Sequence, residues 1–202
     1  MIFKYLVLLL LLTGCTMTPK TPAMISTFDF GPISQLESAQ PIPFPIHLQV
    51  VEIISPAWLD TQAMRYRLAY HHPAQTHVYG QSRWAAAPAK LLTERIRQHI
   101  ASWQKSPDHD NNNNLRSATY SLKIDLEEFI QVFEAIDRSH TIISLRASLV
   151  EHDTRRLIAQ QRFSEIRTTP SADASGAVDA FITTSDQLTA ELIQWSARMA
   201  DR

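Results

Sequence analysis

The chain has one thiol, that of Cys15, and it stands at the end of a short apolar segment. Residues 1–4 carry one positive charge, residues 5–12 are all apolar, and Thr13 and Gly14 are small. A positive start, a short apolar run and small residues at its end are typical of a secretory signal. The run is well short of the roughly 20 apolar residues that a membrane-spanning helix needs.

The ending Leu12-Thr13-Gly14-Cys15 resembles the lipobox of bacterial lipoproteins. The resemblance implies that residues 1–14 are removed, that diacylglycerol is attached to the Cys15 sulfur, and that the new amino group is acylated. The alternative is an ordinary secretory signal ending on an incidental cysteine. Two or more acyl chains hold a protein firmly on a membrane. Thr16 stands where inner-membrane retention usually has Asp, so the resemblance implies the periplasmic face of the outer membrane.

Three histidines and two glutamates are of the residue types that bind metals or carry out acid–base chemistry. His71, His72 and His77 fall on a predicted turn and the strand after it, with no adjacent carboxylate or cysteine to complete a metal shell. Glu127 and Glu128 are neighbours on a predicted strand, where successive side chains point to opposite faces. They converge only across a β-bulge, so we interpret the histidines as surface residues and the glutamates as a solvated strand edge.

The composition and motif content argue against several classes of enzyme and against nucleic-acid binding. The four glycines are scattered, which excludes a phosphate-binding loop, and the chain has no nucleophile elbow or zinc-protease motif. Without residues 1–14 the chain has 18 basic and 20 acidic residues, a net charge of −2, because Lys4 leaves with the signal. That balance does not favour nucleic-acid binding. We predict no catalytic residue, no metal and no cofactor other than the lipid on Cys15.

The remaining sequence predicts one domain on a tether. Residues 15–26 contain Pro19 and Pro22 among small polar residues, and an extended chain of ten residues reaches roughly 30 Å. Residues 27–202 then form a single domain. Alternating or continuous apolar runs predict strands at 26–31, 47–54, 63–70, 76–79, 120–133, 141–151 and 155–166, the fifth with a bulge at Glu127 and Glu128.

Two helices complete the predicted fold, which is an α/β two-layer sandwich. The first follows Pro88, with Leu92, Ile96, His99, Ile100 and Trp103 at helical spacing, and the second spans 174–199. We expect a mixed, largely antiparallel sheet of five to six strands with both long helices on one face.

Trp84 and Pro88 mark the start of the first helix and are candidate partner-binding residues. In the structural interpretation, Trp84 packs against the helix start while Pro88 sets its entry angle. In the functional interpretation, Trp84 is an exposed anchor, because Trp is enriched at binding hot spots.

Several motifs are similar to the ABC-type transport auxiliary lipoproteins, over most of residues 26–198. They are Leu59-Asp60-x4-Arg65-Tyr66-Arg67, Val78-Tyr79, Arg83-Trp84-Ala85-x-x-Pro88-x-x-Leu91-Leu92, Tyr120-x-Leu122 with Glu128-Phe129, Leu145-x-Ala147-x-Leu149 and the helix of Trp195. Systems of this family pair an inner-membrane transporter with a periplasmic protein of the mammalian-cell-entry type and an outer-membrane lipoprotein, and are thought to move lipids.

The resemblance implies a non-catalytic docking subunit that is anchored in the outer membrane and binds a mammalian-cell-entry-type protein. The sequence leaves open whether the protein also forms a homo-oligomer. Two alternatives are a lipid carrier and an assembly factor for an outer-membrane β-barrel. The carrier would hold an acyl chain between sheet and helices, lined by aromatic residues that also suit a core: Phe129, Phe133, Phe163 and Phe181.

Overall fold

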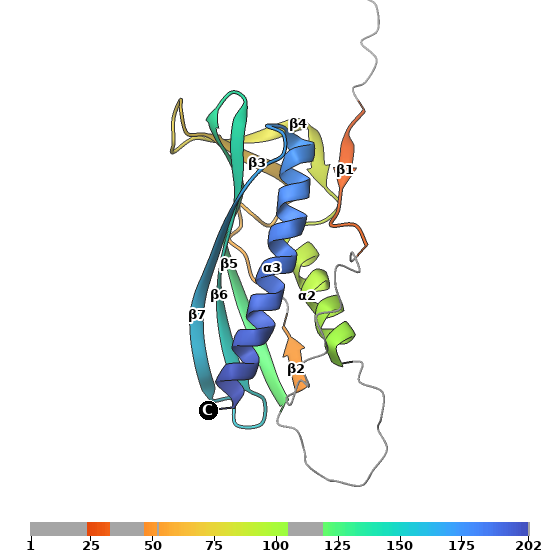
Figure 1. The fold of residues 1–202 in the computed structure, drawn as a ribbon, viewed down its shortest axis with the longest axis vertical. Coiled ribbons are helices and arrows are strands. Elements are labelled where there is room, and N and C mark those ends of the chain that lie inside the picture. Colours follow the sequence, from red (N-terminus) through yellow and green to blue (C-terminus); the bar gives the residue numbers. More distant parts are fainter. Residues whose placement is uncertain (1–23, 33–46, 52, 105–118, 202) are drawn as a thin grey trace, which may run out of the picture.

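The computed structural model describes residues 24–32, 47–51, 53–104 and 119–201 (Figure 1). The predicted signal, Cys15 and most of the predicted tether lie outside these residues. One mixed sheet forms the first layer and two helices the second, both on the same face of the sheet (Figure 1). Neither helix in the described part has the length and apolar character that crossing a membrane requires.

Three long antiparallel strands form the main body of the sheet. They are β5 (Thr119–Ala135), β6 (Arg138–Glu151) and β7 (Leu157–Thr168). The connections between them are tight turns, as predicted. The alternation on β5 slips between Leu126 and Glu128, which confirms the predicted bulge.

Four shorter strands extend this meander, in the order β1-β4-β3-β5-β6-β7, with β2 also on β5. They are β1 (Ser26–Phe28), β2 (His47–Val50), β3 (Ala63–Leu68) and β4 (Thr76–Trp84). β2 and β3 follow each other along one edge of β5, both parallel to it. The predicted fold class is confirmed. Within the described ranges the sheet has seven strands rather than five to six, because the short β1 and β2 pair in parallel with β4 and β5.

The two helices are α2 (Pro88–Gln104) and α3 (Ala174–Ala200), which lie across the sheet on one side. The predicted stripe on α2 is buried at Leu92, Ile96 and Ile100, while the Trp103 side chain is not among those described. The stripe on α3 is buried from Val178 to Trp195. One continuous core therefore lies between helices and sheet.

A buried amide ties the start of α3 to the sheet. Gln131 is fully buried on β5, where its side chain accepts a hydrogen bond from Tyr79 Oη at 2.7 Å and donates to Ser139 Oγ at 2.8 Å. It also donates to the Asp173 carbonyl at 3.2 Å. Burial raises the pKa of Tyr79, and its hydroxyl, already protonated at physiological pH, stays a donor to higher pH than an exposed tyrosine would.

Asp173 caps α3, and its removal has a defined expected cost. Its carboxylate accepts hydrogen bonds from the Gly176 N–H at 2.8 Å and Ser171 Oγ at 2.9 Å, and these lower the pKa of Asp173. We expect Asp173→Ala to lower the free energy of unfolding by about 1 kcal/mol, because an N–H in the first turn loses its partner. Urea unfolding of Asp173→Ala and Asp173→Ser measures this. Serine also caps helices, so equal losses in both variants would contradict the capping role.

Candidate functional site

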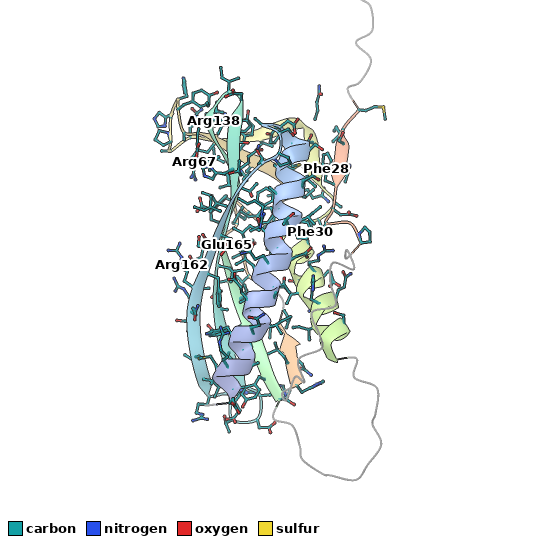
Figure 2. The ribbon with its side chains drawn as sticks, viewed as in Figure 1. Phe28, Phe30, Arg67, Arg138, Arg162 and Glu165 are labelled. Carbon is teal, nitrogen blue, oxygen red and sulfur yellow. The ribbon has the colours of Figure 1, made fainter. Side chains whose placement is uncertain are left out.

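The segment that leads from the predicted lipid anchor is built into the core. β1 runs parallel to β4, with Phe28 opposite Trp84, and the Ala85 N–H donates to the Phe28 carbonyl at 2.7 Å. Two residues later Phe30 is 5% exposed and turns into the space between sheet and helices (Figure 2). Gly31 then has a φ of 61°, in the left-handed region that glycine adopts without strain. The described part of this segment is therefore fixed both to the sheet, through β4, and to the core, through Phe30.

Four aromatic rings from four different parts of the chain meet at this point. Trp84 lies edge-on to Phe30, Phe129 and Phe181, with ring centroids 5.9, 5.6 and 5.7 Å away, and Phe129 stacks on Phe181 at 4.0 Å. Trp84 is 1% exposed, and Pro88 is buried at the start of α2.

Of the two interpretations of Trp84, the functional one needs an exposed ring, and the ring is buried in this structure. A side chain at that depth has no surface to present to a partner, and its geometry is that of the structural interpretation. A role of Trp84 and Pro88 in partner binding stays a prediction. The sequence predicts a strand at 76–79 and places Trp84 before the first helix, whereas the structure extends that strand to Trp84. The sequence does not show which neighbours cover the ring.

A buried ion cluster locks α2 to α3 beside the same segment. Arg95 is 2% exposed and makes two hydrogen bonds with the Asp186 carboxylate, at 2.6 and 2.8 Å. It also donates to the Gly31 carbonyl at 3.2 Å, and His99 Nε2 lies 3.0 Å from Asp186 Oδ1. Burial by itself would raise the pKa of Asp186, but the hydrogen bonds and charges of His99 and Arg95 outweigh it and lower that pKa.

The sequence carries no pattern that predicts this cluster. His99 lies on the inward stripe predicted for the first helix, whereas Arg95 and Asp186 are 91 positions apart and have no local signal that joins them. A charged residue in an otherwise apolar stripe is the one feature of the sequence that could have drawn attention to Arg95.

The face of the sheet opposite the helices is open and carries charged side chains. The bulge in β5 puts both Glu127 and Glu128 on this face. Glu127 accepts from Arg146 at 2.8 Å and from Arg162 at 2.7 Å, while Glu128 lies 3.4 Å from Arg67. Figure 2 shows Arg67 and Arg162 projecting away from the helices. Two carboxylates thus face three guanidinium groups, and neither is paired with the other for acid–base work.

Apolar side chains lie exposed among these charges. The Arg65 guanidinium carbon is 5.9 Å from the centre of the Trp58 ring, which is 41% exposed, and no carboxylate among the described residues pairs with Arg65. Val78, which lies opposite Arg65 on β4, is 47% exposed, and Ile54 and Ile166 elsewhere on this face are 68 and 65% exposed. We call this surface, Ile54, Trp58, Arg65, Arg67, Val78, Arg146, Arg162 and Ile166, the open face. It combines four guanidinium groups, three of them paired with Glu127 or Glu128, with exposed apolar side chains.

The phenylalanines proposed to line a lipid cleft pack against other side chains instead. Phe129 and Phe181 stack on each other, Phe163 lies edge-on to Trp195 at 5.6 Å, and Phe133 lies edge-on to Tyr66 at 5.6 Å. All four are at most 8% exposed. Two depressions in the described part lie away from these rings: one of about 480 Å³ at the turn between β6 and β7, and one of about 330 Å³ between β2 and α2.

The candidate metal-binding histidines do not come together. His71 and His72 are exposed on the turn between β3 and β4, while the His77 ring stacks on Tyr66 at 5.2 Å. Among the described residues no three His, Cys, Asp or Glu side chains gather closely enough to hold a metal ion.

Comparison with protein families matches most of the chain. The profile described as "ABC-type transport auxiliary lipoprotein component" matches residues 30–193, from the buried Phe30 to the last turns of α3. No relative was found among curated proteins.

Solved structures share the fold at low sequence identity. A Xanthomonas campestris protein of family DUF330 is 20% identical, with a TM-score of 0.65, and the match covers 91% of each chain. An uncharacterised protein is 14% identical, with a TM-score of 0.61, over 85% of this chain and 97% of its own. A hypothetical protein of Chlamydia trachomatis is 9% identical, with a TM-score of 0.50, over 77% and 97%. These likenesses support the two-layer architecture alone.

Proposed function

Because this chain belongs to the family of ABC-type transport auxiliary lipoprotein components, we propose that it is an outer-membrane-anchored docking subunit of an intermembrane lipid transport system. Its partner is a periplasmic protein of the mammalian-cell-entry type, and it performs no catalysis itself. The observation that carries the proposal is the combination of a lipobox-like sequence at Cys15 with a domain core built around the segment that follows it.

The anchor and the core act together in this proposal. Acyl chains on Cys15 hold the chain in the membrane, and the tether keeps the domain within roughly 30 Å of it. Phe30 and the contact from Arg95 to Gly31 then make the domain a firm end point rather than a loosely attached one. Confinement near the membrane raises the local concentration of the domain, so a modest affinity for the partner suffices.

The open face is the surface on which we place the partner. It lies on the side of the sheet away from both helices, and its arginines outnumber the carboxylates that they contact. A partner surface that presents acidic side chains beside apolar ones would complement it, because complementary charge guides association while buried apolar area supplies affinity.

Loss of the lipid anchor should release the protein without unfolding it. We expect Cys15→Ala to move the chain from the membrane to the soluble periplasmic fraction, because no thiol remains for diacylglycerol. The circular dichroism spectrum and thermal midpoint should be unchanged, and transport function should be lost. Membrane fractionation and intact mass of the wild type measure this, and a Cys15→Ala protein that stays with the membrane would contradict the anchor.

A second substitution tests separately which of the two membranes holds the lipidated protein. Thr16→Asp retains the thiol and introduces the residue that the resemblance associates with inner-membrane retention. We expect this variant to remain lipidated and to appear in the inner-membrane fraction. If it stays in the outer membrane, Cys15 is still the anchor but Thr16 does not direct sorting.

Crosslinking in intact cells identifies the partner. The full-length protein is crosslinked and isolated, and its partners are identified by mass spectrometry, in parallel with Trp58→Ala and Arg65→Glu. Recovery of a mammalian-cell-entry-type protein from the wild type, reduced in both variants, supports docking on the open face. Recovery of a β-barrel protein alone would favour the assembly factor instead.

A further inference from the structure

The outer edge of β7 has no partner strand among the described residues. β7 is the last strand in the sheet order and has 12 residues, about twice the usual strand length. Figure 1 shows no described segment beside its outer side, while α3 lies across the face. A long unpaired edge is a template for another strand, and proteins usually shorten, charge or cover it.

The ladder with β6 determines which backbone groups point outward. The Thr169 N–H donates to the carbonyl of Ser139, its direct opposite in this register, at 3.0 Å. In an antiparallel pair, hydrogen-bonded and non-hydrogen-bonded positions alternate. Residues 165 and 167 therefore bond to β6. The backbone groups of Ser164, Ile166 and Thr168 point to the free edge.

The side chains at this end of β7 are complementary to those of a second copy of the same edge that runs antiparallel to it. Ile166 is 65% exposed on the open face, with Glu165 and Arg167 on either side of it and pointing to the helix face. Gln187 bridges them, accepting from Arg167 at 2.8 Å and donating to Glu165 at 3.5 Å. The Nε of Arg167 is buried and has no hydrogen-bond partner in the described part of the chain.

We propose that the outer edge of β7 binds the same edge of a second copy of this chain, antiparallel, about a two-fold axis through Ile166. Ile166 then lies opposite its own copy, and Glu165 of each chain lies opposite Arg167 of the other. Ser164 and Thr168 also pair, so the ladder has about six backbone hydrogen bonds, two at each bonded position. Pro170 ends it, because proline has no N–H to donate.

Other symmetric registers are less favourable. Centring the axis on Glu165 or Arg167 places like charges directly opposite each other, which is destabilising. Centring it on Ser164 sets Arg162 against Ile166, and centring it on Phe163 leaves Glu165 and Arg167 without opposite charges. The Ile166 register is the one of these that pairs charge with charge and apolar with apolar. It also closes on itself, so it yields a dimer and not a fibre.

Disulfide crosslinking of the full-length protein in isolated membranes tests the pairing. Ile166→Cys places two sulfurs across the axis, at a Cα separation of about 5.5 Å, within the range of a disulfide. The matched control is Gln160→Cys on the same exposed edge, whose copies would be roughly 40 Å apart, 12 positions at about 3.4 Å each. The wild-type protein, whose one cysteine is Cys15, shows how much disulfide dimer forms through that residue.

We expect Ile166→Cys to form a disulfide dimer at least about ten-fold more than Gln160→Cys. Adding Glu165→Arg to Ile166→Cys should reduce the dimer about ten-fold. Adding both Glu165→Arg and Arg167→Glu should restore it to within about two-fold, because the charges are exchanged but still opposite. Failure of Ile166→Cys to crosslink, equal crosslinking in Gln160→Cys, or indifference to charge reversal would each overturn the proposal. None of these outcomes depends on the partner protein or the cargo.

Discussion

Trp84→Ala should lower the free energy of unfolding by about 3–5 kcal/mol. The ring is 1% exposed and contacts three other aromatic rings, from the N-terminal segment, β5 and α3. Removing it leaves a cavity where these three parts meet, and they cannot all move in to fill it. At about 2–4 °C per kcal/mol for a chain of this size, the thermal midpoint should fall by roughly 10 °C.

Two matched variants separate packing from partner binding. Trp84→Phe retains most of the apolar contact and should cost about half as much or less. Trp58→Ala removes a tryptophan that is 41% exposed on the open face, and should cost less than about 1 kcal/mol. Thermal and urea unfolding of the three variants give the comparison. A Trp84→Ala protein as stable as the wild type would contradict the core position of this ring.

Asp186→Asn should be the second severe change, at about 3 kcal/mol or more. Arg95 is 2% exposed, and the substitution leaves its guanidinium buried without a countercharge, which is what makes breaking a buried pair costly. The Asp186 side chain is 24% exposed, so water recovers part of the loss. Arg95→Met combined with Asp186→Leu should regain most of the stability, because no unpaired charge remains. Unfolding of the single and double variants in a double-mutant cycle measures the coupling.

The same cluster predicts how stability depends on pH. The folded-state pKa of Asp186 is lowered, so its contribution is fully present above the unfolded value of about 3.9 and is lost as pH falls through the folded value. The stability difference between wild type and Asp186→Asn should therefore be largest near neutral pH and shrink below about pH 4. A difference that stays constant from pH 7 to pH 3 would show that the carboxylate charge is not what stabilises the cluster.

The order and type of the elements could be predicted from the sequence, because they follow from local periodicity. Period-2 alternation predicted β5, β6 and β7 to within a few residues, and even the slip near Glu127 was visible as a break in the pattern. The apolar stripes of α2 and α3 predicted both helices and the face that they bury. The motifs around Arg65 and Trp84 also predicted the family, which the match over residues 30–193 confirms.

What only the tertiary structure decided is which distant residues meet. The sequence favoured a packing position for Trp84 over an exposed binding position, and the positions of Phe30, Phe129 and Phe181 around the ring show the packing that the sequence could not specify. Likewise Arg95 and Asp186 contact each other because α2 and α3 meet there, and β7 pairs with β6 alone among the strands that the structure describes. Periodicity predicts on which face of its own helix or strand a residue lies. Burial, ion pairing and free edges depend on the other elements, whose placement is set by non-local packing.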